Sequence, residues 1–187
     1  MFRIVEENSL RRILFIYSSD ELKFKISNIA FSQGDVARVH DNYGHDLLEG
    51  RSESYMHQWK DVCEDGNWER AKSLIKLSIG ELEQILYKFT ARKLPDAGIS
   101  FDNDTSVEDN EYVIELKVSR TFSEGSAEYM MNLCEEFIVD SVLENWALIT
   151  YPEAAQIWGA LKADTANKIR HVSHYNMARP SVAPSPI

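Results

Sequence analysis

The segment from residue 137 to residue 158 constrains the fold of this chain most, because it has the pattern of two amphipathic helices joined by a very tight corner. Thr150 can cap the second helix, Pro152 suits its first turn, where a backbone N–H needs no partner, and Glu153 stands where a capping box requires it. We therefore predict a C-terminal helical hairpin that continues to about residue 177. Its corner is defined by Trp146, Tyr151, Pro152 and Trp158.

Apolar spacings of three and four predict which sides of these helices face the core. On the first helix, over residues 125–149, we expect the inward residues to be Met130, Leu133, Phe137, Val142, Trp146 and Ile149. On the second we expect them to be Ala154, Ile157, Trp158, Leu161, Ile169 and Val172. Beyond the hairpin, residues 178–187 contain three prolines and predict an extended arm.

Two regions before the hairpin also have helical periodicity: residues 19–30 and most of residues 55–93. Gly80 lies inside the second pattern, where glycine costs about 1 kcal/mol relative to alanine, and we interpret it as a close-packing point or a kink. Residues 32–53 show little periodicity and several Gly, Asp, Asn and His residues, so they predict a long irregular loop.

Apolar and polar side chains alternate over residues 112–119, which predicts a strand with one buried face. Residues 2–5 and 13–17 fit short strands, although their periodicity does not exclude helix, and Ile99 and Phe101 are candidates for a partner strand. The fold class is therefore α+β: three to four long helices, including the hairpin, and a small antiparallel sheet within a single domain over residues 1–177.

Composition excludes several classes of protein. The net charge is −10, and residues 101–140 hold eleven acidic but only two basic residues, so sequence-specific DNA binding is not expected. No apolar run approaches the length of a membrane helix, and no secretory signal is visible, so the expected compartment is the bacterial cytoplasm. Cys63 and Cys134 lack metal-ligand spacing and are expected to be reduced core thiols.

Candidate chemical sites are weak. His171 and His174 share a helix face and could bind a metal, but no third ligand stands nearby, so a surface pair near a helix end is favoured. The acidic series Glu124, Glu128, Glu135, Glu136 and Asp140 is interpreted as a solvated outer face. No nucleophile, phosphate loop or cofactor motif is apparent. We therefore expect a protein that is not an enzyme and has no cofactor or bound metal.

The layout from about residue 55 resembles small proteins encoded in the structural-gene blocks of phages and prophages of Bacteroidetes, including crAss-like phages. That group has a long helix, an alternating acidic strand, a helix ending in Trp before a tight corner, and a final helix with a basic end and an Arg-x-Pro or Lys-x-Pro tail. The matching residues here are 112–118, Phe137 with Leu143 and Trp146, 149–155, Lys168 to Arg170, and Arg179-Pro180. The tail holds fewer arginines than is usual in the group.

The resemblance implies a virion structural protein of the neck or tail, made in the host cytoplasm. It would be a head–tail connector or completion subunit that forms a closed homo-oligomeric ring, twelvefold or sixfold, around the DNA channel. Portal or adjacent ring proteins would be its partners, and DNA would pass without sequence-specific binding. Arg179, Pro180, Pro184 and Ile187 would dock on a neighbour. The alternatives are a small cytoplasmic interaction or regulatory module and, less favoured, a metal-dependent enzyme using both histidines.

Overall fold

The computed structural model describes residues 1–7, 10–42, 61–86, 110–119, 122–150 and 152–176, with some residues inside helices and strands described by backbone alone. This part of the chain forms a helix-dominated α+β fold, as predicted. The elements, in chain order, are β1 (Phe2–Glu7), β2 (Leu10–Ser18), α1 (Ser19–Asn42), the short 3-10 helix η1 (Asp61–Cys63), α3 (Asp65–Ile85), β3 (Glu111–Ser119), α4 (Glu124–Thr150) and α5 (Pro152–Asn176).

The three strands form one antiparallel sheet in the order β1-β2-β3. β2 is central, and its Phe15 pairs with Phe2 of β1 and with Ile114 of β3. Because side chains alternate along a strand, this register puts the odd-numbered apolar residues of β2 and the even-numbered ones of β3 on the same face. That inner face is buried and carries Ile13, Phe15, Tyr17, Tyr112, Ile114, Leu116 and Val118.

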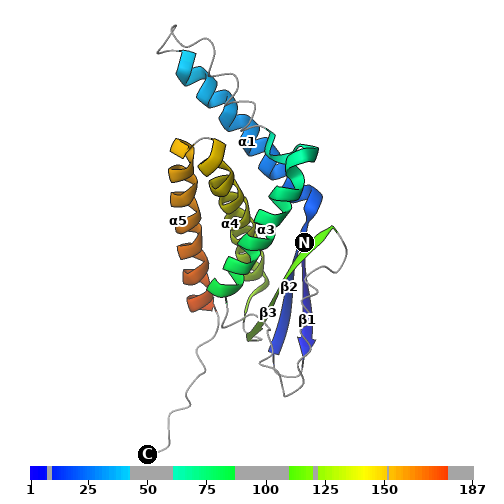
Figure 1. The fold of residues 1–187 in the computed structure, drawn as a ribbon. Helices are drawn as coiled ribbons and strands as arrows, with labels where there is room; N and C mark the ends of the chain where they lie inside the picture. Colours follow the sequence, from blue (N-terminus) through cyan, green and yellow to red (C-terminus); the bar gives the residue numbers. More distant parts are fainter. Residues whose placement is uncertain (8–9, 43–60, 87–109, 120–121, 151, 177–187) are drawn as a thin grey trace, which may run out of the picture.

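The inner face of the sheet packs against the helices, and α4 is the central helix of the fold (Figure 1). α4 contacts α5 along the hairpin, α3 and α1 on its other sides, and β1 and β2 of the sheet. Its central position is reflected in its side chains, because thirteen residues of α4 are buried. The hairpin predicted from the sequence is therefore the centre of the structure.

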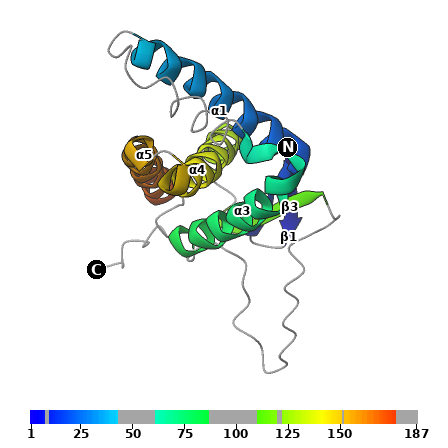
Figure 2. The ribbon, with the colours of Figure 1, turned by 45° about the horizontal axis from the view of Figure 1, so that its top comes forward.

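α1 leaves the end of β2 and runs past the corner of the α4–α5 hairpin (Figures 1 and 2). Its first half packs on the core through Leu22, Ile26 and Ala30, each with no exposed surface. The helix then continues to Asn42, so the predicted loop over residues 32–53 is wrong for its first half. Gly34 is tolerated because a single glycine weakens a helix by only about 1 kcal/mol and no proline follows. Residues 43–53 lie outside the described part of the chain.

The strands predicted at residues 2–5, 13–17 and 112–119 are confirmed, and the partner of β3 is β2. Ile99 and Phe101 fall outside the described residues. The interpretation of Gly80 as a close-packing point is wrong, because a Cβ placed there would meet nothing within 4 Å. Cys63 and Cys134 are both buried free thiols, as expected.

Candidate functional site

The corner between α4 and α5 is the candidate site that the sequence singles out. Trp146 and Trp158 lie on either side of it and are 5% and 4% exposed, so both rings belong to the core and neither faces a partner. Thr150 is the last residue of α4, and its hydroxyl donates to the backbone carbonyl of Trp146 at 2.9 Å. Its hydroxyl thus bonds back into α4, and the predicted cap of α5 by Thr150 stays a prediction. Pro152 begins α5 and is exposed. Tyr151 lies outside the described residues.

Small residues set the distance between the two helices. The face of α5 that packs on α4 contains Ala154, Ala155 and Ala166 as well as Trp158, and α4 contributes Ala147. A Cβ added at Gly159 would lie 2.9 Å from the Oε1 atom of Glu144, so glycine is needed there for the present position of that carboxylate. The hairpin is held by close approach of the backbones at these positions, while Ile169 and Val172 are buried nearer the end of α5.

Large aliphatic side chains consequently lie in solvent around the corner. Ile149 is 61% exposed, Ile157 is 59% exposed and Leu161 is 44% exposed, so the prediction that these three residues face inward is wrong. Leu148, next to Ile149 on the last turn of α4, is 59% exposed. Ile157 and Leu161 are one helical turn apart and therefore share one face of α5. Exposed apolar side chains thus lie on both arms of the hairpin.

A charged cluster, which the sequence did not indicate, joins three helices behind the corner. Lys162 of α5 places its Nζ atom 2.7 Å from Oε2 of Glu81 in α3 and 3.2 Å from Oε2 of Glu144 in α4. The same ammonium group lies 5.5 Å from the centre of the Phe137 ring. Burial lowers the pKa of Lys162, but the hydrogen bonds to both carboxylates outweigh it, so the pKa is raised overall. Lys162 therefore fixes α3 against the hairpin.

The acidic series on α4 is only partly a solvated face. Glu124, Glu128 and Glu136 are exposed, as predicted, but Glu135 forms an ion pair with Lys25 of α1 at 2.5 Å. Asp140 is half-buried against α5, where it forms a hydrogen bond with Thr165. Burial raises the pKa of Asp140 to about 6, helped by the nearby Glu136, while the Thr165 hydrogen bond and Lys168 oppose the rise. For Glu135 and Asp140, the prediction of a solvated face is wrong.

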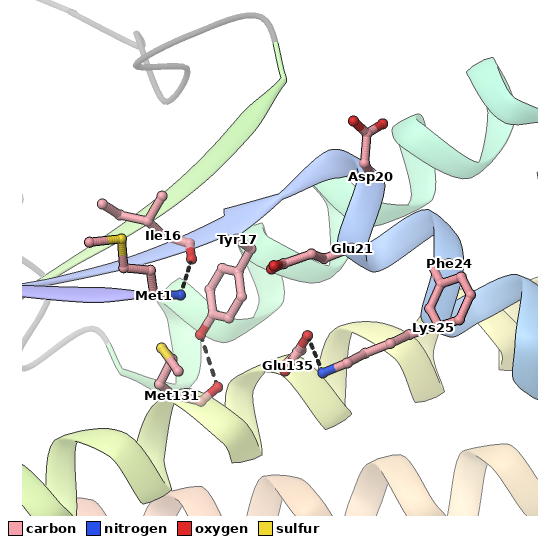
Figure 3. A pocket seen from close by; sticks show the side chains of 9 residues that line it. All are labelled: Met1, Ile16, Tyr17, Asp20, Glu21, Phe24, Lys25, Met131 and Glu135. Carbon is pink, nitrogen blue, oxygen red and sulfur yellow. Dashed lines mark hydrogen bonds and ion pairs between the residues drawn. The ribbon is translucent and has the colours of Figure 1, made fainter.

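A second candidate site is an open depression beside the start of α1, with a volume of about 480 Å³ (Figure 3). Tyr17 lies at its centre and donates its hydroxyl hydrogen bond to the carbonyl of Met131 at 3.1 Å. Burial, chiefly, raises the pKa of Tyr17 well above its ordinary value, so the phenol stays neutral. The rim combines the Lys25–Glu135 ion pair with Phe24, which is 71% exposed.

The structure brings no metal-ligand set together in the part of the chain that it describes. His171 is exposed on the last turns of α5, and the side chain of His174 lies outside the described residues. Burial, the largest influence on each thiol, raises the pKa of Cys63 to about 11 and that of Cys134 to about 12, so neither thiol resembles an activated nucleophile. No helix among the described residues combines the length and apolar character that crossing a bilayer requires.

Five of the eight predicted interface residues lie outside the described residues: Tyr151, Arg179, Pro180, Pro184 and Ile187. Of the other three, the two tryptophans are buried and Pro152 alone faces solvent. Scans against protein-family models, curated proteins and solved structures each found no match.

Proposed function

We propose that this chain is a virion structural protein and not an enzyme, a head–tail connector or neck or tail ring subunit that assembles as a closed homo-oligomer around the DNA channel. The assembly role is supported by the hairpin corner, and the place in a virion is supported by the resemblance to phage structural proteins. One observation carries the proposal: Leu148, Ile149, Ile157 and Leu161 are 44–61% exposed on helices whose other faces are packed in the core.

Exposed aliphatic side chains on a rigid support are what a permanent subunit interface requires. Single surface hydrophobic residues are common, but several on one structural feature favour contact with another protein. Here α4 and α5 are tied by the buried Trp146 and Trp158 and by the Lys162 cluster, so their exposed sides are held in place before assembly. A pre-ordered surface loses less conformational entropy on association than a flexible one.

The charge distribution fits a ring through which DNA passes. The net charge is −10, and the exposed carboxylates of Glu124, Glu128 and Glu136 lie along α4. An acidic surface repels the phosphate backbone at moderate salt, so DNA in such a channel moves without being held. A head-to-tail contact between identical subunits produces a closed ring when its rotation divides a full turn, and the same apolar surface is then covered on every subunit.

The test is native mass spectrometry with negative-stain imaging of the full chain, alone and mixed with candidate portal and ring proteins. We expect closed rings, with six or twelve copies. Ile157→Asp should abolish them, because a carboxylate would have to be desolvated in the interface. Leu77→Asp is the matched control, since Leu77 is 54% exposed on α3, away from the hairpin corner. Monomers or dimers in every mixture, or rings that tolerate Ile157→Asp, would contradict the proposal.

A further inference from the structure

The outer face of the sheet is a surface that the ring proposal does not use. In the β2–β3 register Ile16 pairs with Val113 and Leu14 with Glu115, and these residues alternate with the buried ones, so they lie on the face away from the core. Each is only partly buried. Met1 extends this apolar strip at the edge of the sheet, where its amino group donates to the carbonyl of Ile16 at 2.9 Å.

Two depressions meet on this surface. The one beside Tyr17 shares Met1, Ile16 and Glu21 with a second depression of about 440 Å³, which lies over Leu14 and Val113. The two depressions are therefore adjacent, and together they are here named the sheet groove, which extends from the outer face of the sheet to the start of α1. Figure 3 shows Ile16 beside Met1, with Tyr17 between this pair and the start of α1.

The sheet groove has an apolar floor and an acidic rim. Its carboxylates are Asp20, Glu21, Glu111 and Glu135, and its cations are Arg3, Lys25 and the amino group of Met1, which already donates to the carbonyl of Ile16. Lys25 is already bound to Glu135 at 2.5 Å. Glu21 lines both depressions and is exposed. The groove therefore suits an apolar, extended segment that brings one positive charge close to Glu21.

We propose that the sheet groove receives residues 177–187 of a neighbouring copy of this chain, with Arg179 at Glu21. This inference rests on the proposed ring, because it names one of the contacts between its subunits. The sequence of the segment has one cation, no carboxylate side chain and mostly apolar residues, including Pro180, Pro184 and Pro186. Proline-rich segments bind grooves with aromatic side chains at a low entropy cost, because they are extended before binding. Phe24, which is 71% exposed, supplies an aromatic side chain here.

α5 and the sheet groove are built from different parts of the subunit. α5 packs on α4 and α3, whereas the groove is built from the sheet, the start of α1 and the side of α4 that carries Met131 and Glu135. A segment of eleven residues spans roughly 34 Å in the polyproline form, at about 3.1 Å per residue. An arm of that reach, bound to an adjacent subunit, would give each contact a direction around a ring.

The first test is binding of a labelled synthetic peptide of residues 177–187 to the full chain, measured by fluorescence anisotropy. The protein is diluted until native mass spectrometry shows monomers, so that arms of neighbouring copies do not fill the groove. We expect saturable binding. The Glu21→Arg substitution in the protein should weaken the affinity at least tenfold, and an Arg179→Glu substitution in the peptide should weaken it to a similar extent. The charge-reversed peptide should bind the Glu21→Arg protein better than it binds the wild type. Glu128→Arg is the matched control, because Glu128 is exposed on α4 and lines neither depression.

Circular dichroism and thermal melting establish that each variant is folded, which is expected because Glu21 and Glu128 are both surface residues. Failure of the peptide to bind, or equal binding by the Glu21→Arg and wild-type proteins, would overturn the docking site. Native mass spectrometry of the full-length Arg179→Glu chain separates the two proposals. Intact rings together with no peptide binding would refute the arm contact but keep the ring proposal. Specific peptide binding together with no rings would refute the ring proposal but keep the groove as a binding site.

Discussion

The substitution Asp140→Asn tests the electrostatics of the hairpin. Asp140 is half-buried between α4 and α5, and burial raises its pKa from 3.8 to about 6. Since the folded-state pKa lies above the unfolded value, the protonated form favours folding. The free energy of unfolding contributed by this group is therefore greatest below about pH 4 and falls as the pH rises through 6.

The size of the effect follows from the shift. One pKa unit corresponds to about 1.4 kcal/mol, so the shift sets an upper limit of about 3 kcal/mol. Because Asp140 keeps some contact with solvent and Lys168 lies near it, we expect a smaller value, about 1–2 kcal/mol. Asparagine resembles the protonated acid and can still accept the hydrogen bond from Thr165. Asp140→Asn should therefore raise the free energy of unfolding by that amount at pH 7.5, and by almost nothing at pH 4.

The assay is urea unfolding followed by tryptophan fluorescence, because Trp146 and Trp158 are buried beside the corner and report loss of the hairpin. The two proteins are compared between pH 4 and pH 7.5, so that effects of all other groups cancel. Asp164→Asn is the control for net charge. Asp164 forms an exposed ion pair with Lys168 at 2.7 Å, so its replacement should not stabilise the protein. A loss of stability in Asp140→Asn at pH 7.5, or a difference that is flat with pH, would refute the reasoning.

Three further predictions follow from the packing. Gly80→Ala should raise the free energy of unfolding by about 1 kcal/mol, because the added Cβ meets nothing within 4 Å. Gly159→Ala should raise it by less, because the side chain of Glu144 must move. Equal increases for the two variants in urea unfolding would contradict this. Lys162→Ala should cost about 1–2 kcal/mol by leaving Glu81 and Glu144 without their shared cation, while the exposed Lys168→Ala should change the melting temperature little. Both thiols should resist Ellman's reagent at pH 8 until urea unfolds the chain, since their pKa values are about 11 and about 12; fast labelling of the folded protein would disprove this.

Local pattern in the sequence was sufficient where the signal repeats within one element. The alternation over residues 112–119 identified both faces of β3, and the apolar spacing with Pro152 after it located the two helices of the hairpin. The same reasoning failed for residues 32–42, because polar residues and one glycine lower the helical signal without preventing a helix. Identification of an element from sequence is therefore most secure where one of its faces is continuously apolar.

Tertiary structure alone decided which residues meet. Periodicity indicates which side chains share a face, but it does not indicate which neighbouring element covers that face. On α5 the positions that are buried hold Ala154, Ala155 and Trp158, so Ile157 and Leu161, which lie on another side of the helix, are left in solvent.

Contacts between distant segments have the same origin. The cluster around Lys162 joins it to Glu81, and the sheet pairs Phe15 with Ile114. The burial of Asp140 also depends on where α5 lies. The sequence by itself determined the helical hairpin, the strands and the acidic character of the chain. The exposed corner, the three-helix cluster and the sheet groove required the packing of elements far apart in the chain, because each is formed by side chains that no local pattern relates.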